Sequence, residues 1–286
     1  MCSINAQQTP KILITAHKDT VGFYVKFIDD NGRIHVSRVG ISNPHAIHNQ
    51  PVIIQTNENK IRGILFLSNQ REPYIDVGLN SKSSVESLDI FAGDPVNFDN
   101  PLVELENTSS KHIVCGAGLD NKIGLTIWLQ ILERLNFSSL PFGFYFIATS
   151  MEEWGQKGIQ TALSGLDPNL AIILDVTWEV HPIYIGNGPV ITLMDRGIIL
   201  PRKFREFLRQ LGEKLKIPIQ FEVMEDGTSE AMNTTTYSKG IPTICPLVAT
   251  KNPHTSKEIA EIRDIENTIQ LTMALIRNTA KILQII

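Results

Sequence analysis

The chain has 286 residues, which corresponds to about two domains at roughly 150 residues per domain. Apolar residues make up 42% and charged residues 20% of the chain, and these values exclude a disordered protein or a fibrous repeat. The formal net charge of −4 lacks the basic excess of most nucleic-acid-binding proteins, so we expect no nucleic-acid partner.

No segment of the sequence resembles a targeting or membrane signal. The first ten residues contain neither a basic region nor an apolar stretch, and no apolar run approaches the roughly 18 residues of a membrane span. The three cysteines, Cys2, Cys115 and Cys245, are too far apart to indicate a disulfide framework or a zinc-binding pair. We therefore expect a cytoplasmic protein without a membrane partner, with Cys115 and Cys245 in its core.

A buried strand is predicted over residues 11–16, and a region of different character follows it. From about residue 21 to residue 110, apolar and polar residues alternate in short stretches, and Asp30-Asn-Gly32 indicates a hairpin turn. The predicted strands of this region are 22–28, 33–39, 52–56 and 62–66. This pattern predicts a small β-barrel, in which His45 and His48 are interpreted as surface histidines rather than a metal pair.

From about residue 112, buried apolar runs alternate with amphipathic stretches, which predicts a layered α/β domain. Strands are predicted over 142–148, 171–175, 219–223 and 241–245, and helices over 123–135, 158–163 and 202–216. A final helix is predicted to begin near Ile265 with Asp264 as its cap. We therefore predict a discontinuous α/β domain of residues 1–20 and 111–286, into which a β-barrel domain of residues 21–110 is inserted.

Several polar residues follow the predicted buried strands, at the edge where open α/β sheets bind their ligands. His17 and Asp19 project to the same side of the chain, so one could bind a metal while the other fixes the imidazole. Taken alone, this pair is also compatible with a simple turn, and Asp120 is compatible with a helix cap.

The remaining candidates are Glu152 and Glu153, Asp175, and His254. The adjacent glutamates could divide metal binding and proton transfer between them, although a solvated turn would also accommodate them. Asp175 closes a buried strand, whereas His254 alone would be an ordinary loop residue. Together, two histidines, two aspartates and a Glu–Glu pair predict a two-metal hydrolytic site, with ligands that suit zinc, cobalt or manganese.

An ordered set of motifs covers nearly the whole chain, from about residue 11 to residue 280. The set comprises His17-Lys-Asp19-Thr-Val-Gly22, Gly118-Leu-Asp120-Asn-Lys-Ile-Gly124, Met151-Glu152-Glu153-Trp-Gly155, Asp175-Val176-Thr177, Asp226-Gly-Thr228, Gly240-Ile-Pro-Thr243 and His254-Thr-Ser-Lys-Glu258. In these motifs and their order the sequence resembles the tetrahedral aminopeptidases. That family includes glutamyl and deblocking aminopeptidases and proteins formerly labelled endoglucanases.

The resemblance implies an enzyme that removes N-terminal residues from peptides and carries two divalent metal ions per chain, zinc or cobalt, with manganese as an alternative. It implies that His17 and Asp175 hold one metal, that Glu153 and His254 hold the other, and that Asp120 bridges the two. Glu152 would be the general base, and Asp19 would orient His17. The implied assembly is a homo-oligomer, of which the family's dodecamer is one form.

Four departures from the family's pattern bear on substrate preference and assembly. Only 16 residues precede His17, and Asn121-Lys122 replaces a frequent Asp-Arg. Thr250-Lys-Asn-Pro253 lacks an arginine and an aromatic residue, and Asp226-Gly-Thr-Ser-Glu230 replaces a glycine-rich Gly-Thr-Asp. Two alternatives therefore stay open: a catalytically silent relative that serves as an assembly or binding protein, and a hydrolase of other amides. In every case we expect the barrel to supply no metal ligand.

Overall fold

The protein is described by a computed structural model, which covers residues 1–40, 46–106 and 112–286. The interpretation of His45 and the predicted domain boundary at residues 110 and 111 lie outside these residues. No helix in the described ranges is both long and apolar enough to cross a membrane.

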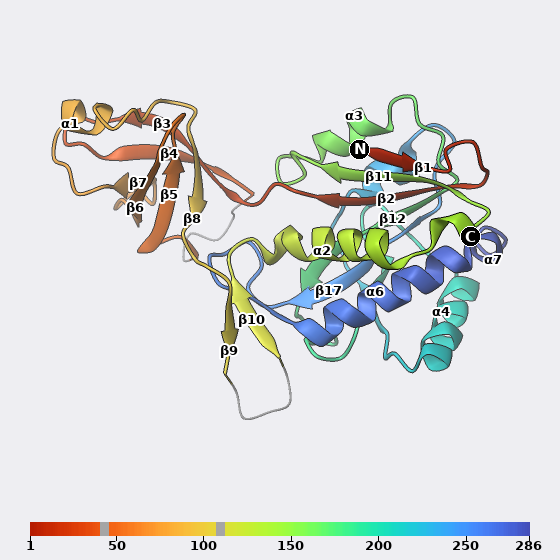
Figure 1. The fold of residues 1–286 in the computed structure, drawn as a ribbon. Coiled ribbons are helices and arrows are strands. Elements are labelled where there is room, and N and C mark those ends of the chain that lie inside the picture. The colour runs from red at the N-terminus through yellow and green to blue at the C-terminus, as the bar shows by residue number, and fades with distance from the viewer. Residues whose placement is uncertain (41–45, 107–111) are drawn as a thin grey trace.

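A five-stranded sheet forms the centre of the α/β part, with the strand order β1-β11-β2-β12-β16 (Figure 1). Its strands are β1 (Cys2–Ile4), β2 (Lys11–His17), β11 (Gly143–Thr149), β12 (Leu170–Ile173) and β16 (Thr243–Ile244). All neighbours are parallel except β1, which pairs with β11 in antiparallel register. The carboxyl ends of β2, β11 and β12 therefore point to one edge of the sheet.

Helices cover both faces of this sheet (Figure 1). One face packs against α2 (Leu119–Arg134), α4 (Arg202–Leu215) and α6 (Ile262–Arg277), and the other against α3 (Lys157–Leu163) and α5 (Ala231–Thr236). Side chains alternate along a strand, so Ile12 and Ile14 enter the first core cluster whereas Leu13 enters the second. Because both faces are covered, β2 is apolar from Ile12 to Ile14, with no polar position between Lys11 at its start and Thr15.

Two smaller sheets and short helices complete the α/β part. One sheet has the order β13-β17-β14-β15, and the other has the order β18-β10-β9. The first comprises β13 (Asp175–Trp178), β14 (Val190–Met194), β15 (Gln220–Val223) and β17 (Pro246–Thr250). The second comprises β9 (Val103–Leu105), β10 (Ile113–Gly116) and β18 (Glu258–Glu261). A 3-10 turn, η2 (Phe137–Ser139), and a short last helix, α7 (Thr279–Ile282), lie at the periphery.

The inserted β-barrel is present, as the alternating pattern predicted (Figure 1). Six strands close it in the order β3-β4-β7-β6-β5-β8. They are β3 (Gly22–Ile28), β4 (Ile34–Val39), β5 (Gln50–Gln55), β6 (Lys60–Leu67), β7 (Pro73–Asp76) and β8 (Pro95–Phe98), with one helical turn, α1 (Lys82–Glu86). The barrel has its own core, which includes Phe23, Ile34 and Leu65. The molecule is thus a layered α/β protein with a small barrel inserted after β2.

Among the differences from the predictions, two change where an element begins or ends. The predicted strand 171–175 divides at Leu174, where β12 of the central sheet ends and β13 of a second sheet begins. Asp264 does not cap the last helix, because α6 begins directly after β18 with Glu261 at the cap position. Asp264 instead lies buried in the first turn, and its carboxylate accepts hydrogen bonds from the main-chain N–H groups of Gly186 and Gly188, at 2.5 and 2.8 Å.

Candidate metal centre and active site

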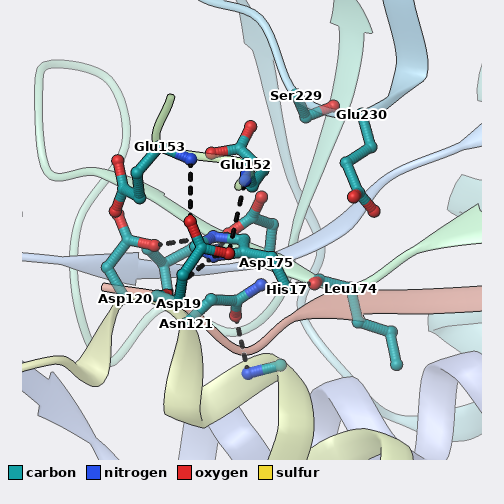
Figure 2. Close-up of polar contacts among 12 residues, drawn as sticks. His17, Asp19, Asp120, Asn121, Glu152, Glu153, Leu174, Asp175, Ser229 and Glu230 are labelled. Carbon is teal, nitrogen blue, oxygen red and sulfur yellow. Dashed lines mark hydrogen bonds and ion pairs between the residues drawn. The ribbon is translucent and has the colours of Figure 1, made fainter. Parts of the chain in front are cut away.

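The predicted site residues meet at the carboxyl edge of the central sheet, and all of them except His254 are labelled in Figure 2. His17 is the last residue of β2, and Asp175 is the first residue of β13. Glu152 and Glu153 follow the end of β11, Asp120 is in the first turn of α2, and His254 lies between β17 and β18. Side chains that are up to 237 positions apart in the sequence are thereby brought to one place (254 − 17 = 237).

One group of potential metal ligands consists of His17, Asp120 and Asp175. The His17 Nε2 atom lies 3.1 Å from Asp120 Oδ1 and 3.5 Å from Asp175 Oδ1. All three residues are buried. One imidazole and two carboxylates are a donor set that suits a divalent transition metal.

The second group consists of Asp120, Glu153 and His254. Here the His254 Nε2 atom lies 3.2 Å from Asp120 Oδ2 and 3.6 Å from Glu153 Oε2. Asp120 belongs to both groups and directs one carboxylate oxygen to each. A carboxylate in this position can bridge two metal ions, which is the arrangement of two-metal hydrolytic sites.

The backbone around Asp120 is not helical, although it lies within α2. Asp120 has φ −79° and ψ 103°, and the peptide bond between Asp120 and Asn121 is cis. The Asn121 side chain donates to the Leu174 carbonyl at 2.8 Å and accepts from the Gly124 N–H at 2.8 Å. These bonds fix the turn that presents the Asp120 carboxylate to both histidines, and they tie it to the break between β12 and β13.

Glu258 positions both groups, and the sequence analysis assigned it no role. Its buried carboxylate accepts the main-chain N–H of Asp120 at 2.9 Å and the main-chain N–H of His254 at 3.0 Å. It therefore connects the shared residue Asp120 to a residue of the second group. The available signal was its place in the motif His254-Thr-Ser-Lys-Glu258, but the long-range contact to Asp120 has no local signature.

Asp19 contacts both His17 and the glutamate loop. The His17 Nδ1 atom lies 3.0 Å from the main-chain oxygen of Asp19, which defines the orientation of the ring. The Asp19 carboxylate accepts the main-chain N–H groups of Glu152 and Glu153, at 3.3 and 3.2 Å (Figure 2). Asp19 thus orients the imidazole through its backbone and supports the Glu152–Glu153 segment through its side chain.

The site is crowded with acidic groups. Burial and the charge of Asp175 raise the pKa of Glu152 to about 9, and burial and the charge of Asp120 raise the pKa of Glu153 to about 8. Burial lowers the pKa of His254, but the hydrogen bond to Asp120 and the charge of Glu153 outweigh it and raise the pKa to about 9. Cations would relieve this repulsion. In addition, Glu153 Oε1 is buried without a hydrogen-bond partner among the described residues, as expected for a metal-binding oxygen.

A further buried carboxylate, Glu230, lies beside the site and was also missed (Figure 2). It accepts a hydrogen bond from the Thr15 hydroxyl at 2.7 Å, two residues before His17 on β2. Burial raises the pKa of Glu230 to about 7. In the sequence, Glu230 was notable only as part of Asp226-Gly-Thr-Ser-Glu230, which departs from the family's glycine-rich motif.

The barrel contributes contact rather than ligands to the site. Neither group of potential ligands contains a residue of the barrel, within the part of the chain that the structure describes. Gly40, which follows β4, has φ +70°, and a Cβ atom there would lie 2.8 Å from Glu153 Oε2 and 2.7 Å from Val21 Cγ1. The end of β4 therefore packs directly against a candidate metal ligand.

Comparisons with known proteins identify the class of protein to which this fold and site belong. The family model described as M42 glutamyl aminopeptidase matches residues 1–271. The chain therefore belongs to this family, which agrees with the resemblance found in the sequence.

Individual relatives give the same result. A putative aminopeptidase of Acetivibrio thermocellus is 28% identical over 277 residues, which are 91% of this chain and 81% of the relative. Among solved structures, an aminopeptidase of Desulfurococcus kamchatkensis is 30% identical with a TM-score of 0.86, over 94% of this chain and 79% of that chain.

Two further structures show the same fold at lower sequence identity. A TET aminopeptidase of Thaumarchaeota archaeon SCGC AB-539-E09 has a TM-score of 0.91 at 24% identity, over 99% of this chain and 86% of that chain. The TET1 peptidase of Pyrococcus horikoshii has a TM-score of 0.80 at 24% identity, over 93% of this chain and 83% of that chain. That peptidase can assemble into a tetrahedron or a large octahedral shell.

Proposed function

We propose that this protein is an aminopeptidase that hydrolyses N-terminal residues from peptides with two divalent metal ions. The observation that carries the proposal is the pair of ligand groups that share Asp120, with Glu152 adjacent to them and a member of neither. Membership of the M42 family supports the aminopeptidase activity. The catalytic unit would be residues 1–20 and 111–286, with residues 21–110 as an inserted domain whose last strand, β9, pairs with β10 of that unit.

The ligand sets assign a place to each ion. His17 and Asp175 would hold one metal, Glu153 and His254 would hold the other, and Asp120 would bridge them. Imidazole and carboxylate donors favour zinc or cobalt, with manganese as an alternative. When bound, such ions polarise a carbonyl oxygen and make water a stronger nucleophile at neutral pH.

The residues of the chain would divide the remaining work. Glu152 would accept the proton of the attacking water and deliver it to the leaving amine, because its carboxylate belongs to neither ligand group. The carboxylates of Asp19 and Glu258 also lie outside the groups, but they accept main-chain N–H groups. Asp19 would hold Glu152 and Glu153 at the correct distance through their main-chain N–H groups. Glu258 would fix the positions of Asp120 and His254 relative to each other by accepting the main-chain N–H group of each.

Glu152→Gln and Glu153→Gln test the division of roles between the two glutamates. Glutamine keeps the size of the side chain but cannot accept the proton, so Glu152→Gln should retain metal and lose on the order of a hundredfold or more in turnover of amino-acid amides. Glu153→Gln should weaken one metal, and excess metal ion should partly restore its activity.

Bound metal by elemental analysis and amide hydrolysis should be measured side by side for both variants. Loss of metal in Glu152→Gln with full metal in Glu153→Gln would reverse the two roles. A metal-loaded wild-type protein that hydrolyses no peptide or amino-acid amide would favour a catalytically silent relative instead. Turnover of acylated amino acids but not of peptides would favour a hydrolase of other amides.

We further propose that the chain forms a homo-oligomer, of which a dodecamer is one candidate form, in the cytoplasm. The assembly of the Pyrococcus horikoshii TET1 peptidase supports this proposal. Two exposed apolar residues at a sheet edge also support it. Val103 begins the edge strand β9 and Leu102 precedes it, and these side chains are 46% and 63% exposed. Apolar edges of this kind favour association. Light scattering of the purified protein distinguishes a dodecamer from smaller assemblies.

A further inference from the structure

A cavity lies where β2 passes into the barrel strand β3, beside the segment that carries Glu152 and Glu153. Its volume is about 530 Å³, and segments from both parts of the molecule line it. The barrel contributes residues of β3, β4 and β8, and the α/β part contributes Asp19 and the segment Ser150–Trp154. Neither the ligand groups nor the proposed mechanism makes use of this pocket.

The pocket and the catalytic site share one wall. Ser150, Met151 and Trp154 line the pocket, and the two glutamates lie between them in the sequence. Asp19, whose carboxylate accepts the main-chain N–H groups of both glutamates, also lines it. A group bound in the pocket would therefore touch the same backbone that presents Glu152 to the reaction.

The chemistry of the pocket suits an apolar or aromatic side chain. Tyr24, Met151 and Trp154 leave 48%, 46% and 49% of their surfaces exposed, and Phe23, which also lines the pocket, is buried. Among the described residues that line it, Asp19 alone is charged, and both oxygens of that carboxylate are already hydrogen-bonded. The other polar side chains of the lining carry no charge: Thr20, Ser37, Asn97 and Ser150. A pocket with aromatic walls and uncharged polar groups binds apolar side chains better than charged ones.

The backbone at Met151 is a second sign that this wall is adapted to a ligand. Met151 has φ +59°, a left-handed conformation that costs free energy in any residue other than glycine. The conformation nevertheless leaves an apolar side chain half exposed in the pocket, beside the two glutamates. Strained residues of this kind concentrate at sites of binding and catalysis.

The position of the pocket selects one part of the substrate. The residue that protonates the leaving amine has to lie beside the nitrogen of that amine, and the mechanism above assigns this step to Glu152. The amino acid that carries this nitrogen must therefore lie next to the segment Ser150–Trp154. Ser150, Met151 and Trp154, which flank the two glutamates in the sequence, line the pocket, so the pocket is the candidate to receive the side chain of that amino acid.

We propose that this pocket binds the side chain of the second residue of the peptide, on the leaving side of the cleaved bond, and that it favours apolar and aromatic residues there. The proposal rests on the aminopeptidase function proposed above. It assigns to Tyr24 of the barrel and Trp154 of the glutamate segment a role in substrate specificity.

The experiment compares substrates that differ only on the leaving side. Amides of Leu, Glu and Lys identify the preferred first residue X, and kcat/KM is then measured for X-Gly-amide and X-Phe-amide with the metal-loaded full-length protein. The wild-type protein should prefer X-Phe-amide by on the order of tenfold, the range of discrimination of an apolar pocket. Damage to the catalytic groups would lower both rates together, whereas loss of the pocket lowers their ratio.

Tyr24→Ala and Trp154→Ala truncate opposite walls of the pocket at half-exposed side chains, so the core of each part stays intact. Each should reduce the ratio to within about twofold of unity. Tyr74→Ala is the matched control, because Tyr74 lies on β7 of the barrel outside the lining of the pocket, and its ratio should equal that of the wild type.

Two kinds of failure are distinguishable. Equal rates for the two peptides in the wild type, or a ratio that both pocket variants retain, would overturn the assignment of the pocket while the aminopeptidase function stands. If neither amides nor peptides are hydrolysed by the metal-loaded protein, the proposed function is wrong and the pocket assignment falls with it.

Discussion

Gly40 gives the sharpest test of how the barrel supports the metal site. In Gly40→Ala the new methyl group would meet Glu153 Oε2 at 2.8 Å and Val21 Cγ1 at 2.7 Å, at a backbone φ of +70°. The left-handed backbone costs about 1–2 kcal/mol for alanine. Overpacking adds about 1–3 kcal/mol, so we expect a total destabilisation of about 2–5 kcal/mol. Either the barrel end or Glu153 has to move.

Gly78→Ala is the matched control for this substitution. Gly78 also belongs to the barrel region and has φ +81°, but a Cβ atom there would meet no atom within 4 Å. It should therefore lose only the backbone contribution of about 1–2 kcal/mol. The difference between the two variants isolates the contact with Glu153.

Thermal unfolding, metal affinity and amide hydrolysis should be measured for both variants. At about 2–4 °C per kcal/mol, Gly78→Ala should lower the Tm by roughly 2–8 °C, with unchanged metal affinity. Gly40→Ala should lower the Tm further and weaken metal binding, since Glu153 is displaced. Equal metal affinity and equal turnover in the two variants would refute the reasoning that the barrel positions a metal ligand.

Two further predictions concern the charges of the site. Glu258→Gln should weaken metal binding by roughly 10- to 100-fold, because either the Asp120 N–H or the His254 N–H loses its acceptor. A titration against a competing chelator measures the affinity, and an unchanged value would exclude this positioning role. In the metal-free protein, the pKa values of Glu152, Glu153 and His254 are raised to about 9, about 8 and about 9, so the folded state binds more protons than the unfolded state across neutral pH. Its Tm should therefore fall from pH 6 to pH 9, whereas metal affinity should rise over the same range, because binding releases these protons; a metal-free Tm that increases toward pH 9 would contradict the shifts.

The sequence by itself determined the elements and the candidates for the site. Apolar runs identified β2 and β11 because strands covered by helices on both faces need no polar alternation. Period-two alternation and the Asp30-Asn-Gly32 turn identified the barrel. His17 and Asp175 were recognisable because each stands at the end of such a run, where an α/β sheet binds ligands.

Only the tertiary structure decided how these residues are held together. The predicted strand 171–175 breaks at Leu174, whose N–H still pairs with the Thr15 carbonyl of β2 whereas its carbonyl accepts from the Asn121 side chain, a contact that no local pattern encodes. Glu258 acts on Asp120 across 138 positions of the chain, and Gly40 approaches Glu153 from the barrel. Hydrophobic periodicity is a local property and is legible in the sequence, whereas buried polar contacts and close approaches depend on which distant segments the folded core brings side by side.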